Sequence, residues 1–219
     1  MIKGWNLGAQ IQSNDIEVLK AIKRKNISSS AYKELIDYGN TLGEKTESAI
    51  ILGMPEDTRD RHFESLRFGI DNNAKTVRMF QAMLLVGTEM ASKVTRKQYQ
   101  LKSKFRTIPG CIGIYDILGK KHPVAEIEEI IIGSNSLSTD DYIDCRVMNL
   151  IIETFYNDTM FEEVFGMLRT INVSVMDCLI YIKNHSEIYS NKVKEIMKSY
   201  IFVLFMVLIL RLSSGVHAS

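Results

Sequence analysis

The order of apolar and amphipathic segments predicts an α/β fold in the first half of the chain. Three short apolar segments, at residues 5–11, 48–52 and 76–85, alternate with stretches whose apolar residues recur at helical spacing. The middle segment is an apolar run of strand length, typical of a strand buried on both faces of a parallel sheet. A strand–helix–strand–helix–strand order favours parallel strands joined by right-handed crossovers.

Capping signals mark the helices of this first half. Asn14 or Asp15 can accept hydrogen bonds from the free backbone N–H groups at the start of the first helix. Ser29 or Ser30 is expected to do the same for the second helix. Gly43 is expected to end that helix, because glycine readily adopts the left-handed backbone found after helix C-termini. The predicted helices cover residues 15–25, 28–42 and 59–72.

The second half of the chain carries a different pattern. Residues 93–106 are rich in lysine, arginine, tyrosine and glutamine, which favours a solvated face. Long helical patterns then predict helices at residues 140–157, 159–170 and 173–184, and from residue 190 onward. The expected domains are an α/β part at residues 1–108, a mainly α-helical part at 109–198 and an apolar tail at 199–219.

The apolar tail allows more than one interpretation. Residues 200–210 form an unbroken apolar run, which is well short of the roughly 20 residues that a helix needs to cross a bilayer. The run could be a membrane anchor or an interfacial segment, or instead a buried helix or a tail foreign to the original protein. We favour the last two alternatives, because the final residues look arbitrary, and we expect no membrane partner.

Charge and cysteine content exclude several classes of protein. The formal net charge of +1 argues against a nucleic-acid-binding protein, which usually presents a basic face. The three cysteines, Cys111, Cys145 and Cys178, are far apart in the sequence. Such an odd, scattered set favours neither disulfides nor a metal site, and it fits a reducing, cytoplasmic environment. Each cysteine is interpreted as a small buried apolar residue.

Three motifs follow the predicted strands in a recognisable order. Gln12-Ser13 ends the first strand, and Arg24 ends the helix after it. The second strand runs into a Gly-x-Pro-x-Asp-Thr segment that begins at Gly53, and the third leads through Leu84 to a Gly-Thr pair. The order and spacing resemble strands four, five and six of radical S-adenosylmethionine (SAM) enzymes, especially the branch with an N-terminal cobalamin-binding domain. The resemblance is strongest over residues 4–92.

The resemblance implies a fold and part of a ligand site. The fold would be the C-terminal half of a (β/α)6 partial barrel with about three parallel strands, formed by residues 1–108, and followed by an α-helical subdomain. Gln12 and Ser13 would hydrogen-bond the ribose and methionine portions of SAM. Arg24 would pair with the carboxylate of SAM through its guanidinium group.

The remaining predicted contacts come from the second and third strands. In the resemblance, Gly53 lets the backbone approach the adenine ring, because it carries no side chain, and Pro55 belongs to the same motif. Leu84 would offer an apolar contact to the ring. Taken alone, Gly53 and Pro55 are also what an ordinary turn between a strand and a helix requires.

The family's cofactors are only partly matched by this sequence. Radical SAM enzymes hold a [4Fe–4S] cluster with a Cys-x3-Cys-x2-Cys motif, and no such motif occurs here. The chain is therefore interpreted as a C-terminal fragment that contributes to SAM binding, whose cluster and cobalamin would belong to a missing N-terminal half. By itself it is not expected to bind a cluster.

Two functions from different classes follow from the sequence. The first is a fragment of a radical SAM enzyme, which cleaves SAM reductively at its cluster and acts on a small-molecule substrate that the sequence does not specify. The second is a non-catalytic binding or scaffold module that pairs with another polypeptide.

Overall fold

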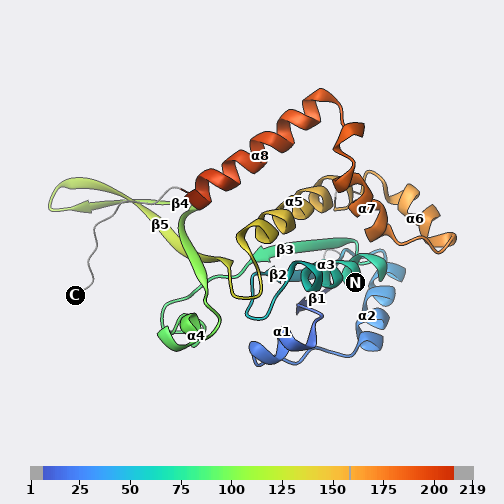
Figure 1. Ribbon diagram of the computed structural model, residues 1–219, viewed down its shortest axis with the longest axis horizontal. Coiled ribbons are helices and arrows are strands. Elements are labelled where there is room, and N and C mark those ends of the chain that lie inside the picture. Colours follow the sequence, from blue (N-terminus) through green and yellow to red (C-terminus); the bar gives the residue numbers. More distant parts are fainter. Residues whose placement is uncertain (1–6, 158, 210–219) are drawn as a thin grey trace.

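The computed structural model describes residues 7–157 and 159–209 of the chain. Its centre is a parallel three-stranded sheet in the order β1-β2-β3, built from β1 (Leu7–Gln12), β2 (Thr46–Leu52) and β3 (Thr76–Gln81) (Figure 1). The predicted α/β fold with parallel strands is confirmed. The third strand is shorter than the predicted 76–85, because pairing with β2 ends with the hydrogen bond from the Ala82 amide to the Leu52 carbonyl. From Met83 the chain pairs with a later strand.

Helices of the first half begin where short polar side chains cap them. Asp15 accepts hydrogen bonds from the amides of Glu17 and Val18 at the start of α1 (Ile16–Ala21). Ser28 caps α2 (Ser29–Thr41), so the predicted caps Ser29 and Ser30 are wrong. Ser28 is the residue with an extended backbone, which a cap requires, whereas the next two serines are already helical. The third helix is α3 (Arg59–Asp71).

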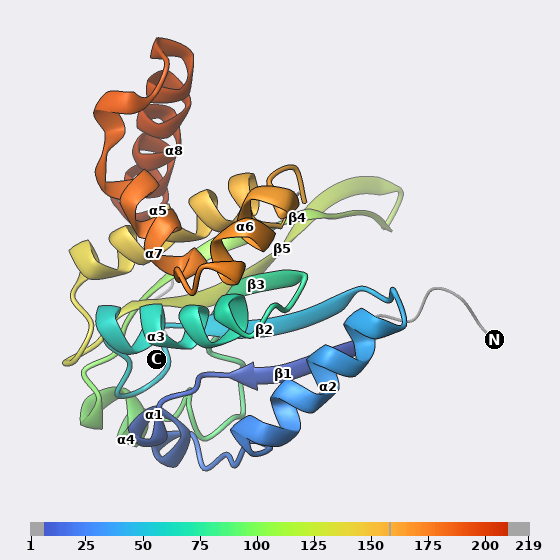
Figure 2. The same cartoon turned by 90° about the vertical axis from the view of Figure 1, so that its right-hand side faces the viewer.

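The core lies on one face of the sheet. On β1, Ala9 and Ile11 are buried while Gly8 and Gln10 are exposed, and Phe80 on β3 is 51% exposed. The covered face packs against α2, α3 and a later helix, α5 (Thr139–Phe155). Figure 2 shows α5 and its neighbours stacked over α3, which lies along the sheet. The largest buried core side chains include Tyr32, Ile36, Ile50, Leu66, Tyr142 and Met148.

Gly39 sets how closely α2 approaches the sheet. A β-carbon at this position would lie 2.5 Å from Cγ2 of Thr46 on β2. We therefore expect Gly39→Ala to lower the free energy of unfolding by about 2 kcal/mol, because overpacking exceeds the gain in helix propensity. The control is Gly166→Ala, whose β-carbon would meet no atom of the described residues within 4 Å and which should be neutral or stabilising. Urea unfolding curves compare the two, and equal effects would contradict this account.

A long antiparallel hairpin separates the two halves of the chain. It consists of β4 (Lys102–Ile117) and β5 (Lys120–Gly133) and follows α4 (Lys93–Gln98). Ala82 accepts a hydrogen bond from the Ile131 amide at 2.9 Å, so the base of the hairpin continues the sheet beyond β3. The rest projects from the molecule in Figure 1. The two long strands were not among the predicted elements, and the expected domain boundary at 108/109 falls inside β4.

The predicted helices of the second half are all present. They are α5, α6 (Glu162–Thr170), α7 (Val175–Asn184) and α8 (Asn191–Ile209), with a short 3-10 turn (Ser186–Ile188) before α8. α8 contains most of the predicted apolar tail and touches α5 through a hydrogen bond from Tyr200 Oη to the Arg146 carbonyl at 3.3 Å. Within residues 7–157 and 159–209, no helix has the length and apolar character needed to cross a membrane. Residues 210–219 lie outside the described part.

Side chains cover backbone groups at both borders of the parallel sheet. The Asn157 side chain accepts from the Val77 amide at 2.9 Å and donates to the Val77 carbonyl at 3.0 Å, as a neighbouring strand would. Beside β1, the Arg24 guanidinium donates to the Gln10 carbonyl, and the Asn26 amide donates to the Ile11 carbonyl at 2.9 Å. Backbone groups at these positions are therefore satisfied without an additional strand.

Candidate functional site

The carboxyl ends of the three parallel strands form the candidate site. Ligands of α/β folds bind outside such strand ends, where loops converge. Gln12 ends β1 and Ser13 follows it, Gly53 and Pro55 follow β2, and Leu84 lies just beyond β3. The structure thus gathers these predicted residues at one edge of the sheet, although their roles in ligand binding stay predictions.

The end of β1 is an irregular turn. The register between β1 and β2 shifts between Ala9 and Gln12, and Gln12 has a left-handed backbone with φ of 58°. Ser13 is 3% exposed, and its hydroxyl lies 3.3 Å from that of Ser65 on α3. Ser13 Oγ also accepts from the Asp15 amide at 3.1 Å. The Ser13 side chain therefore supports the turn. The neighbouring side chains of Gln12 and Asn14, which are not buried, are the ones open to a ligand.

The loop between β2 and α3 is held by a buried carboxylate. Gly53 has φ of 87°, and its amide donates to Asp57 Oδ2 at 3.2 Å. Asp57 and His62 are 2% and 1% exposed, with Nδ1 of His62 3.6 Å from the same oxygen. Asp57 is part of the predicted Gly-x-Pro-x-Asp-Thr segment but was assigned no role, and His62 was not singled out. Burying two polar side chains here without such contacts would be costly, so they fix the loop that carries Gly53 and Pro55.

Leu84 belongs to a small apolar cluster beside the carboxyl ends of the parallel strands. It is 3% exposed and packs with Val18, Met54, Ala82 and Ile131. The Leu84 amide donates to the Glu129 carbonyl at 2.8 Å, which ties it to β5. A β-carbon on Gly53 would also lie 3.5 Å from the Ile131 carbonyl oxygen. β5 therefore covers Leu84 and one side of Gly53, and ligand access must come from the other side.

Arg24 is occupied by contacts with its own chain. Its guanidinium donates to the Gln10 carbonyl, and Nε donates to Asn26 Oδ1 at 3.2 Å. The predicted ion pair with a ligand carboxylate would require the guanidinium to leave these partners. Because Arg24 is exposed, such an exchange needs no change in the core.

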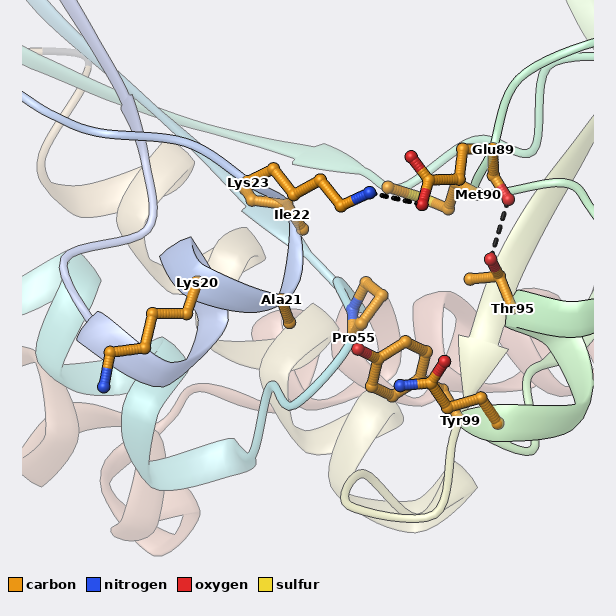
Figure 3. A pocket seen from close by; sticks show the side chains of 10 residues that line it. Lys20, Ala21, Ile22, Lys23, Pro55, Glu89, Met90, Thr95 and Tyr99 are labelled. Atoms are coloured by element: carbon orange, nitrogen blue, oxygen red, sulfur yellow. Dashed lines mark hydrogen bonds and ion pairs between the residues drawn. The ribbon is translucent and has the colours of Figure 1, made fainter.

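An open pocket lies beside these strand ends. Its volume is about 390 Å³, which falls within the range of small-molecule sites. Pro55 is the predicted site residue that lines it, and Ile22, Met90 and Tyr99 supply further apolar surface. Figure 3 shows Pro55 and Tyr99 together on one side. The pocket could not be predicted, because α1, the β2–α3 loop and α4 meet only in the folded chain.

Charged and polar groups border the opposite side of this pocket. Nζ of Lys23 lies 2.6 Å from Glu89 Oε1, and Thr95 Oγ1 donates to the Glu89 carbonyl at 2.8 Å (Figure 3). Lys20 also lines the pocket, and it pairs with Glu17 at 2.9 Å. Both ion pairs are solvent-exposed and contribute little to stability, so a charged ligand could replace either of them at low cost.

The described residues do not fit an iron–sulfur cluster. They contain no group of three or more His, Cys, Asp or Glu side chains suited to a metal ion. Cys145 is fully buried in the core, and this burial raises the pKa of its thiol. Cys111 lies on the hairpin and Cys178 on α7, so the three thiols belong to different parts of the fold. No reaction step at a cluster is therefore assigned to the described residues.

Comparison with known proteins finds two methyltransferases. The chain is 28% identical over 140 residues to a 2-(S-pantetheinyl)-carbapenam-3-carboxylate methyltransferase of Streptantibioticus cattleyicolor, covering 62% of the chain and 19% of that protein. It is 27% identical over 139 residues to the cobalamin-dependent radical SAM methyltransferase TokK of Streptomyces tokunonensis, covering 61% and 19%. The chain is similar to this branch of methyltransferases.

The similarity covers only part of this chain and a smaller part of each relative. No family model matches the chain. The chain spans about a fifth of the length of the two relatives, so most of each relative has no counterpart here. The similarity agrees with the branch that the sequence motifs resemble.

Proposed function

We propose that this chain is part of a cobalamin-dependent radical SAM methyltransferase and forms one wall of its SAM site. The observation that carries the proposal is the meeting of Gln12-Ser13, Gly53 and Pro55 at the carboxyl edge of one parallel sheet. The two methyltransferase relatives support it. In this proposal the three strands are the second half of a partial barrel.

The groups of the wall have distinct parts in this proposal. Gln12, half-buried at the end of β1, offers an amide to the ribose and methionine portions of SAM. Pro55 and the backbone of the β2–α3 loop form an apolar and hydrogen-bonding surface for the adenine. Arg24 changes partner from the Gln10 carbonyl to the SAM carboxylate. The cluster and the cobalamin, which supply the radical and the methyl transfer in such enzymes, would be held by residues outside this chain.

A non-catalytic scaffold is the second candidate. The side-chain caps on Val77 and Gln10 favour it, because they satisfy the borders of the sheet without further strands. The DNA upstream of codon 1 distinguishes the two functions. An in-frame extension encoding Cys-x3-Cys-x2-Cys would support the enzyme, and a separate upstream reading frame would support a module that pairs with another polypeptide.

S-adenosylhomocysteine provides a direct test of the proposed wall. Titrated into the ¹⁵N-labelled chain, it should shift the amide resonances of Gln12, Ser13 and Gly53. Gln12→Asn should weaken the fitted affinity about tenfold, equivalent to the loss of one good hydrogen bond, because asparagine tolerates the left-handed backbone but has a shorter side chain. Gln10→Asn, on the same strand, is the matched control. Shifts confined to other regions, or equal effects of both variants, would rule out the wall.

A further inference from the structure

The first turns of α3 touch both loops of the candidate site. Arg61, His62 and Ser65 lie on one side of the helix, as the spacing of three to four residues requires. One loop is the turn after β1, and the other connects β2 to α3. No motif in the sequence marks these three residues, and all of their site contacts are with residues from other elements or from the preceding loop.

Ser65 and Arg61 hold the turn after β1. Ser65 is 1% exposed and donates to the Arg61 carbonyl at 3.0 Å. Since its one hydrogen is used there, it accepts from the Ser13 hydroxyl at 3.3 Å and from the Asn14 amide at 2.9 Å. The Arg61 guanidinium lies 3.3 Å from Asp15 Oδ2, the cap of α1. The turn therefore depends on α3 for three of its polar groups.

Arg61 and His62 hold the loop after β2. Nη1 of Arg61 donates to the Glu56 carbonyl at 2.6 Å. His62 packs beside Asp57, whose other carboxylate oxygen receives no hydrogen bond from residues 7–157 and 159–209. Arg61 thus contacts both loops through one guanidinium, whose several donors point in fixed directions.

Each loop needs such support, because each includes an unfavourable backbone conformation. Gln12 and Glu56 both have left-handed φ values, 58° and 64°, which side chains other than glycine adopt only when the surroundings enforce them. We infer that Arg61 and Ser65 are positioning residues that fix the two loops of the SAM wall as one unit. The inference rests on the proposed function, and it assigns to α3 a role in ligand binding without ligand contact.

Hydrogen exchange of the ligand-free chain tests the coupling. In Arg61→Gln, the Asn14 and Gly53 amides should both exchange about tenfold faster, because the single guanidinium that joins the loops is lost. Arg67→Gln is the matched control: it lies on the same helix, but its guanidinium pairs with Glu64 and Asp177, away from both loops. It should leave both amides unchanged. Faster exchange at Gly53 alone, or equal effects of the two variants, would overturn the inference.

Ligand binding separates this inference from the proposed function. With S-adenosylhomocysteine as the probe, Arg61→Gln and Ser65→Ala should each weaken binding about tenfold, while Arg61→Lys, which keeps one donor group, should recover part of the loss. If the wild-type chain binds no S-adenosylhomocysteine, the proposed function fails, and with it the assigned role in binding. If it binds and these variants bind equally well, the positioning role fails while the proposed function stands.

Discussion

Leu66→Ala is expected to lower the free energy of unfolding by about 3 kcal/mol. Leu66 is fully buried in the core between α3 and the sheet. Its truncation removes apolar contacts and leaves a cavity that the strands and helix cannot close, and both terms destabilise the fold. Because α3 carries the positioning residues, the variant should also accelerate exchange at the candidate site. Urea denaturation monitored by circular dichroism measures the loss.

Leu118→Ala is the matched control for this prediction. Leu118 is 99% exposed at the turn of the hairpin, so removing its side chain should change stability by less than about 0.5 kcal/mol. The pair compares the same chemical change in a buried and an exposed place. A similar loss of stability in both variants would show that the core does not lie where Leu66 is packed.

Glu129→Gln should lower the free energy of unfolding by about 2 kcal/mol at neutral pH, as expected for a charge-assisted hydrogen bond. Nη1 of Arg96 donates to Oε1 of Glu129 and Nη2 donates to Oε2, each at 2.6 Å. The Ser103 hydroxyl also donates to Oε1. These contacts join α4 to the base of the hairpin. Glutamine keeps the shape of the side chain but loses the ion pair.

The same variant predicts a pH dependence. Hydrogen bonding from Arg96 holds the pKa of Glu129 below its ordinary value, against the opposing effect of burial. A carboxylate with a lowered pKa stabilises the fold above its unfolded pKa of about 4.3, and this stabilisation is lost as pH falls through the lower folded value. Between pH 6 and pH 3 the wild type should therefore lose more stability than Glu129→Gln. Parallel pH profiles would contradict the role of the pair.

Elements governed by local rules were predictable from the sequence. The parallel strands, the four later helices and the end of α2 at Gly43, which has φ of 68°, follow from hydrophobic periodicity and backbone preference. The cap at Ser28 was missed by one residue, because three serines in a row satisfy the same rule. Local patterns identify the existence of an element more surely than its first residue.

The hairpin was missed for a physical reason. Its strands carry exposed apolar side chains, among them Ile112 and Ile114. The sequence is also interrupted by two prolines, at positions 109 and 123, so neither clean alternation nor an apolar run of full strand length occurs. Its turn is Leu118-Gly119, both with positive φ, in place of the usual Asn-Gly. Such a strand forms because of the strand it pairs with, and local sequence patterns do not identify that partner.

The residues of the candidate site also fall into those that local sequence patterns could place and those that they could not. Gln12, Ser13, Gly53 and Pro55 could be placed at strand ends from their order in the sequence. Ser65 could not, since its contacts join residues far apart in the chain; Ser13 and Ser65, for example, are 52 residues apart. His62 could not either, because its burial beside Asp57 depends on how α3 packs against the sheet. Long-range contacts of this kind require knowledge of how the elements pack.

The side-chain caps at the borders of the parallel sheet affect whether a strand of a second copy could pair with it. Asn157 saturates Val77 with two hydrogen bonds from a half-buried position, so this side is closed to another strand. On the β1 side, the exposed Arg24 guanidinium covers the Gln10 carbonyl and the half-buried Asn26 amide covers the Ile11 carbonyl, so a further strand would have to displace two side chains. Side-chain caps at both borders of the parallel sheet therefore oppose the addition of a strand from a second copy of the chain.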